Sequence, residues 1–136
     1  MALGYHFSRN FAKVRTGTSW RAHLVMAVKL LAISPDVKGH IVEYGCWKGG
    51  STTNLSLLAA INGRKLRVYD SFEDLPPPAD GDPIAARSFK GGFIPGVFGG
   101  SLDEVTGNVE NTARSNPANF SKAGMRTPCR ITRALL

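Results

Sequence analysis

The sequence predicts an α/β fold built on a parallel sheet, and two observations carry this prediction. A glycine-rich turn, Gly45–Gly50, separates a short β-branched run from a helical segment. A second run, Lys65–Tyr69, follows that segment and ends at Asp70. The order strand, turn, helix, strand is that of a right-handed βαβ unit, in which the two strands are parallel.

The elements of this unit follow in order along the chain. Ser19–Ile33 is predicted as a helix with Ser19 as its N-cap, because apolar residues recur at helical spacing and are expected to face the core: Trp20, Leu24, Val28 and Leu31. His40–Tyr44 has an apolar, β-branched centre and is predicted as a buried strand. Thr52–Ile61 is rich in leucine and alanine, and the Asn-Gly pair that follows ends this second helix.

The composition changes after Asp70. Residues 71–100 are rich in glycine and proline, and the prolines at 76–78 exclude a helix there. Two interpretations of residues 79–100 remain open: a surface loop, or a mobile lid whose phenylalanines close over a cofactor. Ser101 then begins a third helix as its N-cap, with Glu104 completing a capping box.

Length and composition set the broad class. A chain of 136 residues suffices for one domain. Its apolar runs are too short to span a membrane and its first residues lack a signal-peptide core, so a cytoplasmic protein is expected. The two cysteines form no CxxC motif, which makes a disulfide framework or a zinc site unexpected.

The net charge of +7 is unevenly distributed. Residues 71–110 are acidic on balance, whereas residues 111–136 hold five basic residues and no acidic one. The basic character therefore depends largely on this final segment, and nucleic acid is not the expected partner of the remainder.

The glycine turn can be compared with three kinds of ligand site. A Walker A loop requires Gly-Lys-Ser/Thr, but Gly50 is followed directly by Ser51. A dinucleotide fingerprint requires a central glycine where Trp47 stands, so a pyrophosphate is disfavoured. A nucleoside cofactor without phosphates remains compatible, and Asp70 stands at the strand end where an acid binds the ribose hydroxyls.

Two motifs resemble a known family. Residues 41–51 read Ile-Val-Glu-Tyr-Gly-Cys-Trp-Lys-Gly-Gly-Ser, and residues 68–76 read Val-Tyr-Asp-Ser-Phe-Glu-Asp-Leu-Pro. Together they resemble the class I S-adenosylmethionine-dependent methyltransferases and, more narrowly, the macrocin-type sugar O-methyltransferases. That family commonly has glycine at the position of Asp74. The resemblance covers about residues 20–110 and implies a Rossmann-like parallel sheet of which only the N-terminal half is present.

The resemblance also implies roles for individual residues. The pocket for the methionine part of S-adenosylmethionine would be shaped by Glu43, Gly45, Gly49 and Gly50. Ser51 and Thr52 would present the helix N-terminus. Asp70 would bind the ribose, with Ser71 and Phe72 beside the adenosine. Two alternatives remain open: Asp70 caps a helix or turn, and Glu43 is a structural acid.

The residues that would carry out the chemistry are not found. The resemblance implies a divalent metal, expected to be Mg²⁺, that is held by carboxylates from later strands of the sheet. No motif with such carboxylates follows residue 104. No catalytic residue or metal ligand is therefore assigned. If one base is restored after the codon of Glu110, the reading frame from Asn111 onward changes. The segment can then be translated into a sequence that contains acidic residues and the runs Lys-Gly-Trp-Tyr and Asp-Thr-Leu-Pro, which are typical of this family. We therefore expect a truncated or frame-shifted chain, which sequencing of the gene across codon 111 tests.

The expected organisation is an N-terminal extension (1–18), a partial cofactor-binding domain (19–110) and an aberrant basic tail (111–136). The favoured function is methyl transfer from S-adenosylmethionine to a hydroxyl of a sugar or natural product, by a chain that is a fragment of the enzyme. The alternative is a non-enzymatic basic module that binds nucleic acid or another polyanion. The expected partner is a small acceptor molecule that carries a hydroxyl group. No membrane partner is expected, and the question of a homo-oligomer stays open.

Overall fold

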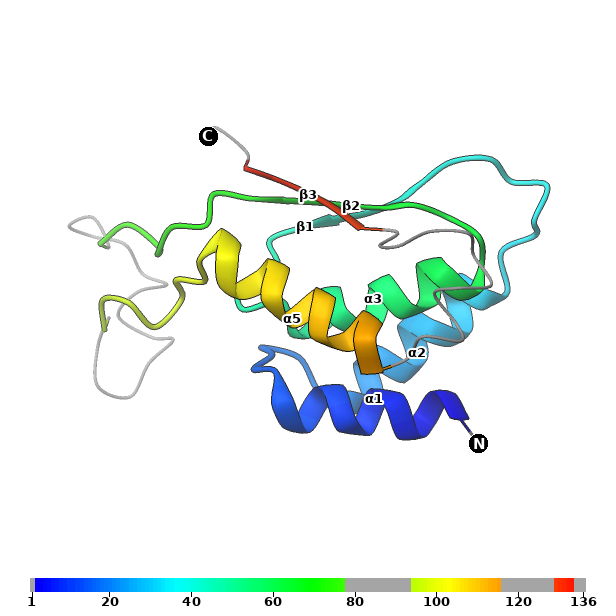
Figure 1. Cartoon of the computed structure of the whole chain (residues 1–136). Coiled ribbons are helices and arrows are strands. Elements are labelled where there is room, and N and C mark those ends of the chain that lie inside the picture. Colours follow the sequence, from blue (N-terminus) through cyan, green and yellow to red (C-terminus); the bar gives the residue numbers. More distant parts are fainter. Residues whose placement is uncertain (1, 78–93, 116–128, 134–136) are drawn as a thin grey trace.

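The core of the fold is a three-stranded parallel sheet with helices packed on one side (Figure 1). The computed structural model describes residues 2–77, 94–115 and 129–133. The strands are β1 (Ile41–Tyr44), β2 (Leu66–Asp70) and β3 (Cys129–Arg133), in the order β1-β2-β3. Ile41 lies opposite Leu66, and Leu66 opposite Cys129. The predicted βαβ unit and parallel sheet are thus confirmed.

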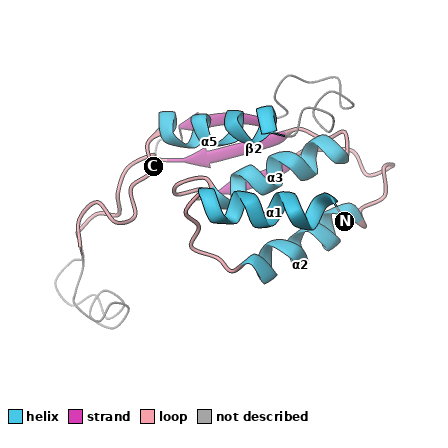
Figure 2. Ribbon diagram, turned by 60° about the horizontal axis from the view of Figure 1, so that its bottom comes forward, coloured by secondary structure: helices cyan, strands magenta, loops and turns pink. Residues whose placement is uncertain are grey.

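Within the described residues, four helices form two layers beneath the sheet (Figures 1 and 2). Helices α3 (Gly50–Ile61) and α5 (Leu102–Ser115) contact the strands, while α1 (Ala2–Lys13) and α2 (Trp20–Leu31) pack against α3 from the other side. Because α3 is surrounded on all sides, nearly all of its residues are buried, including Leu57 and Leu58. No helix of the described residues is long and apolar enough to cross a membrane.

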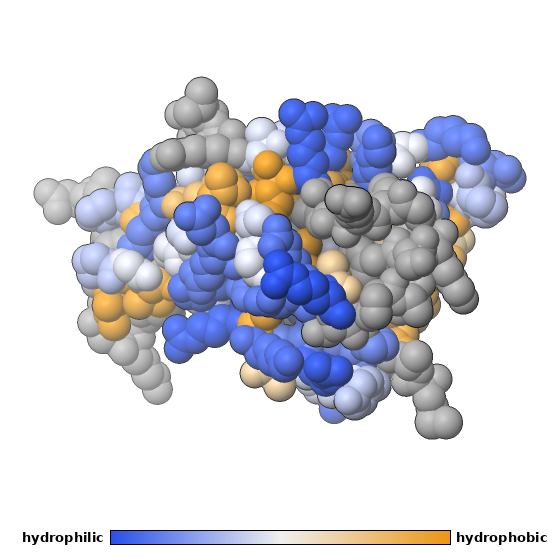
Figure 3. Space-filling view, viewed as in Figure 1, coloured by the Kyte–Doolittle hydropathy of each residue, from blue (hydrophilic) through white to orange (hydrophobic). Residues whose placement is uncertain are grey.

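The sheet buries only one of its faces within the described residues. Ile41 and Glu43 of β1 point toward the helices and are buried, whereas Val42 and Tyr44 are exposed. The expectation of a fully buried first strand was therefore wrong. Apolar side chains also interrupt the polar surface on the face shown in Figure 3.

Helix α2 has the predicted position and cap but not the predicted orientation. The Ser19 hydroxyl accepts the Ala22 N–H at 3.3 Å, which confirms the N-cap. The buried residues are His23 and Ala27, however, while three of the predicted core residues are exposed: Trp20, Val28 and Leu31. The predicted core face was wrong, because polar contacts of His23 with distant residues set the rotation of this helix.

Two elements were not predicted. Helix α1 lies within the segment described above as an extension, and its Phe7 is buried in the core. Strand β3 lies in the basic final segment and pairs with the whole of β2. Helix α5 also continues to Ser115, beyond the point where the family resemblance ends.

Candidate cofactor site

The site forms where β1 and β2 end and α3 begins. The glycine turn leaves β1 through a left-handed residue, Gly45 (φ +78°), and enters α3 through a second, Gly49 (φ +80°). Between them Trp47 has φ +48°, and Phe72 after β2 has φ +58°. Positive φ is costly for residues with a side chain and clusters at functional sites. The two strained residues therefore lie one in each of the two motifs.

Asp70 fixes the turn from the neighbouring strand. Its Oδ2 accepts the backbone N–H groups of Cys46 at 2.6 Å and Trp47 at 3.2 Å, and its Oδ1 accepts the Phe72 N–H at 2.8 Å. Hydrogen bonds to a carboxylate are stronger than those between neutral groups. The acid predicted to bind the ribose thus also holds the turn, the alternative role considered for it.

Gly50 is required by packing. A Cβ at Gly50 would lie 2.5 Å from the carbonyl oxygen of Arg15 and 2.5 Å from the Cβ of Thr16. A Cβ at Gly49 would lie 3.1 Å from the Cγ1 of Val105 in α5. The turn is therefore held between the α1–α2 connection and α5, which leaves no room for a side chain at Gly50 and makes a tight contact with Val105 for a Cβ at Gly49.

Glu43 joins β1 to the first turn of α3. Its two carboxylate oxygens accept the hydroxyl groups of Ser51 and Thr52, the latter at 2.7 Å. Burial raises the pKa of Glu43, and Asp70 adds to this, while the two hydroxyl bonds oppose it. The predicted residues Glu43, Ser51 and Thr52 are thus brought together as a buried network.

The N-terminus of α3 offers hydrogen-bond donors. Gly49, the N-cap, supplies no side-chain acceptor. The N–H groups of Gly50, Ser51 and Thr52 donate to no acceptor in the described part of the chain. Such donors, together with the positive end of the helix dipole, favour a carboxylate or another anion.

A cavity of about 420 Å³ lies beside the turn. It contains three of the predicted site residues, Gly45, Asp70 and Ser71. The rest of its wall is largely aromatic or apolar: Tyr44, Trp47, Tyr69, Leu75, Pro76 and Phe98, with Glu73 and Asp74. Sequence reasoning missed the two tyrosines, which stack with their ring centres 5.3 Å apart. Alternation along each strand marks the outward-facing positions, but the pairing of Tyr44 with Tyr69 follows from the register between β1 and β2.

The remaining predicted residues lie outside this cavity. Phe72 is half-buried and packs against the core. Glu43, Gly49, Gly50, Ser51 and Thr52 form the turn and helix start next to it. Three of the nine predicted residues therefore form the cavity wall, five form the turn and the start of α3, and Phe72 packs against the core.

The start and end of the glycine-rich loop are anchored at this cavity. The Trp47 indole donates to the Val97 carbonyl at 3.0 Å, and Asp74 accepts the backbone N–H groups of Gly96 and Phe98, the latter at 3.0 Å. The bond from Gly96 lowers the pKa of the Asp74 carboxyl. Residues 78–93, the greater part of the predicted lid, lie outside the described residues.

Lys48 of the glycine turn contacts α5 through two groups. Its Nζ pairs with the Glu104 carboxylate at 3.1 Å, and its carbonyl accepts the side-chain amide of Asn108 at 3.0 Å. Ser101 caps α5 by accepting the Glu104 N–H at 3.1 Å, as predicted. The Glu104 side chain bonds Lys48 instead of completing a capping box.

Two further groups bear on the chemistry of the site. Burial and the neighbouring Asp70 raise the pKa of the Cys46 thiol, so Cys46 is not an activated nucleophile. Within the described ranges, no three His, Cys, Asp or Glu side chains lie close enough to hold a metal ion. The described residues therefore offer no candidate cluster for the Mg²⁺ that the resemblance implies.

Parallel strands, a glycine turn and an acid at the end of the second strand place the chain among the α/β folds whose usual ligand site lies at the carboxyl ends of the strands. The family model of macrocin-O-methyltransferase (TylF) matches residues 9–91. The chain belongs to this family.

A solved structure supports the fold. The chain resembles the crystal structure of CalS11, a calicheamicin methyltransferase, with a TM-score of 0.55 and 18% sequence identity. The likeness covers 85% of this chain and 44% of the other, so the chain spans less than half of that protein. No curated protein matches the sequence. The predicted fold class, an incomplete methyltransferase-like α/β fold, is confirmed.

Proposed function

We propose that this chain is the cofactor-binding part of an S-adenosylmethionine-dependent O-methyltransferase whose acceptor is a hydroxyl of a sugar or natural product. One observation carries the proposal: a cavity of about 420 Å³ is lined by Asp70 and by two residues of the glycine turn, Gly45 and Trp47. This turn leads into the start of α3, whose first N–H groups have no acceptor among the described residues. Membership of the macrocin-O-methyltransferase family supports the type of reaction and acceptor.

The residues fit the separate parts of this cofactor. The methionine carboxylate matches the donors of Gly50, Ser51 and Thr52 at a positive helix end. The adenosine matches the aromatic wall near Tyr69, and its ribose matches Asp70, which has acceptor capacity beyond its three backbone bonds. No phosphate is present in this cofactor, which agrees with the indole of Trp47 at the turn.

When bound, the cofactor supplies an electrophilic methyl group on a sulfonium. The chain holds the cofactor and excludes water from one side of it, and orienting the two reactants provides much of the rate of such a displacement. Removal of the acceptor proton requires a base. None of the described residues is assigned to that role.

Calorimetric titration of the full chain with S-adenosylhomocysteine tests the proposal. We expect binding of one molecule per chain, weakened at least tenfold by Asp70→Ala, which removes a charged acceptor. Asp36→Ala is the control, because Asp36 is an exposed acid in the connection before β1. Thermal melts of each variant show whether it folds.

A second pair of variants separates cofactor binding from stability of the turn. Leu75 is 55% exposed in the cavity wall, and Leu102, 40% exposed, lies outside that cavity. Leu75→Asp is expected to weaken binding without loss of folding, whereas Leu102→Asp leaves binding unchanged. Absence of binding by the unmodified chain, or equal affinities of the two variants, contradicts the proposal.

A further inference from the structure

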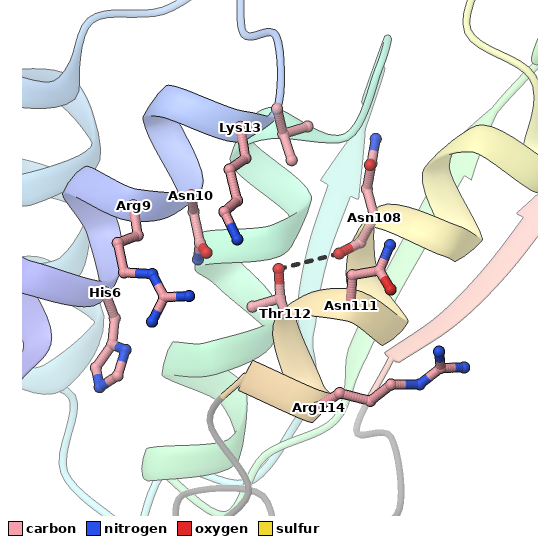
Figure 4. Close-up of a pocket in the computed structure, with 9 residues that line it drawn as sticks. His6, Arg9, Asn10, Lys13, Asn108, Asn111, Thr112 and Arg114 are labelled. Atoms are coloured by element: carbon pink, nitrogen blue, oxygen red, sulfur yellow. Dashed lines mark hydrogen bonds between the residues drawn. The ribbon is translucent and has the colours of Figure 1, made fainter.

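A second cavity, of about 360 Å³, lies between α1 and α5 (Figure 4). It shares no residue with the cavity beside the glycine turn. Its volume falls within the roughly 300–1,000 Å³ typical of small-molecule sites. The lining is almost wholly polar: His6, Arg9, Asn10, Lys13, Val14, Asn108, Asn111, Thr112 and Arg114.

The α1 side of this cavity carries unneutralised positive charge. Arg9 and Lys13 are one helical turn apart, and both side chains extend toward α5 in Figure 4. Like charges at this spacing destabilise a helix. Neither of them forms an ion pair with an acid of the described residues. The guanidinium of Arg9 instead lies 5.6 Å from the ring centre of Tyr5.

The α5 side supplies neutral hydrogen-bonding groups. Thr112 points toward α1 in Figure 4, and its hydroxyl donates to the Asn108 carbonyl at 3.0 Å. Asn108 and Asn111 also line the cavity, and the side-chain amide of Asn108 donates to the Lys48 carbonyl at 3.0 Å. Glu110, one residue away, pairs with Arg114 at 3.2 Å and does not line the cavity. The charged groups among its lining residues are therefore all basic.

We propose that this cavity binds a small phosphorylated molecule that also carries hydroxyl groups, such as a nucleoside diphosphate or a sugar phosphate. Arg9 and Lys13 match the phosphoryl oxygens, because charge-assisted bonds from cationic donors are the strong ones. On the α5 side, the oxygen of the Thr112 hydroxyl can accept a hydrogen bond from a sugar hydroxyl. The volume leaves room for such a group next to the phosphate. The ligand is distinct from the methyl donor, which contains no phosphate.

Calorimetric titration of the full chain with uridine diphosphate tests this site. Excess S-adenosylhomocysteine is present, so that the nucleotide does not occupy the cofactor cavity. We expect one molecule of uridine diphosphate per chain, and no binding of uridine alone. Arg9→Gln and Lys13→Gln should each weaken binding about tenfold, since each removes a hydrogen bond to a charged group. Lys29→Gln, an equal charge change on the exposed side of α2, should leave binding unchanged.

Two results would overturn the proposal. Equal affinity of the Lys13→Gln and Lys29→Gln variants would show that only net charge matters. Tighter binding of an oligothymidylate of about nine nucleotides, with the same loss on Arg9→Gln, would show a surface for single-stranded nucleic acid instead. Lys13 is exposed and forms no contact with a described acid, so Lys13→Gln keeps the test valid if Arg9→Gln alters folding.

Discussion

Asp70 holds the backbone of Cys46, with 2.6 Å between its Oδ2 and the Cys46 nitrogen, although the two residues are 24 positions apart. The end of β2 thus fixes the turn that follows β1. The same carboxylate lines the cavity proposed for the cofactor. One side chain therefore ties the shape of the glycine turn to the wall of the site, and the order of the turn should depend on it.

Adding a methyl group at Gly50 should destabilise the fold. The new Cβ in Gly50→Ala would lie 2.5 Å from the Arg15 carbonyl oxygen, so the α1–α2 connection must move. We expect a loss of about 1–3 kcal/mol in the free energy of unfolding, measured by urea denaturation.

Gly107→Ala is the matched control for this substitution. Gly107 lies within α5, and a Cβ there would meet nothing within 4 Å. We expect a gain of about 0.5–1 kcal/mol, because alanine is the better helix former. Equal effects of the two substitutions would show that the close contact at Gly50 is not real.

Folding stability should depend on pH through His23. This buried side chain contacts Thr18 Oγ1 at 2.6 Å through Nε2 and the Asn54 side-chain nitrogen at 2.8 Å through Nδ1. The Asn54 Oδ1 accepts from Asn10 at 2.9 Å, so its nitrogen must donate to an unprotonated Nδ1. Burial lowers the pKa of His23 below 6.5.

The direction of the pH effect follows from this lowered pKa. The unfolded chain takes up a proton below pH 6.5 while the folded chain resists it, so this contribution to stability is complete above pH 6.5 and is lost as the pH falls through the folded-state pKa. Urea denaturation from pH 7.5 to 5 measures it, as the difference between wild type and His23→Gln. His40→Gln, at an exposed position, should keep the wild-type slope. A slope retained in His23→Gln would show that another group is responsible.

Asp74 should slow hydrogen exchange of backbone amides at the end of the glycine-rich loop. The family commonly has glycine here, yet in this chain the carboxylate accepts the N–H groups of Gly96 and Phe98. In Asp74→Gly, we expect faster hydrogen exchange at these two amides, measured by NMR, and unchanged exchange in β2. Glu73→Gly provides the control for loss of an adjacent acid. Unaltered exchange at Gly96 would mean that the carboxylate does not hold the loop.

The βαβ unit could be predicted because its signals are local. Glycines mark the turn, apolar runs mark β1 and β2, and Asp70 ends the second strand. Seven of the nine predicted site residues are placed by this unit, and Asp70 brings Ser71 and Phe72 to the same end of the sheet. The tyrosines of the cavity wall required knowledge of the register between β1 and β2.

The remaining errors came from interactions between distant residues. In α2 the apolar stripe that contains Trp20 and Val28 predicted the buried face, but both of these residues are exposed. His23 is buried instead, because Asn54 and Thr18 satisfy its ring nitrogens. Strand β3 reads Cys-Arg-Ile-Thr-Arg in a segment rich in basic residues, and its place in the sheet comes from its pairing with β2. Neither effect is visible in a local window of sequence.

The most direct test of the account is the response of individual backbone amides to ligands in NMR spectra. S-adenosylhomocysteine should shift the amide signals of Gly50, Ser51 and Thr52 together with that of Ser71. 5′-Methylthioadenosine has the nucleoside but no methionine carboxylate, so it should shift Ser71 and leave the three helix amides unchanged. Shifts of the helix amides with both ligands, or with neither, would contradict the claim that the start of α3 receives the carboxylate of the methyl donor.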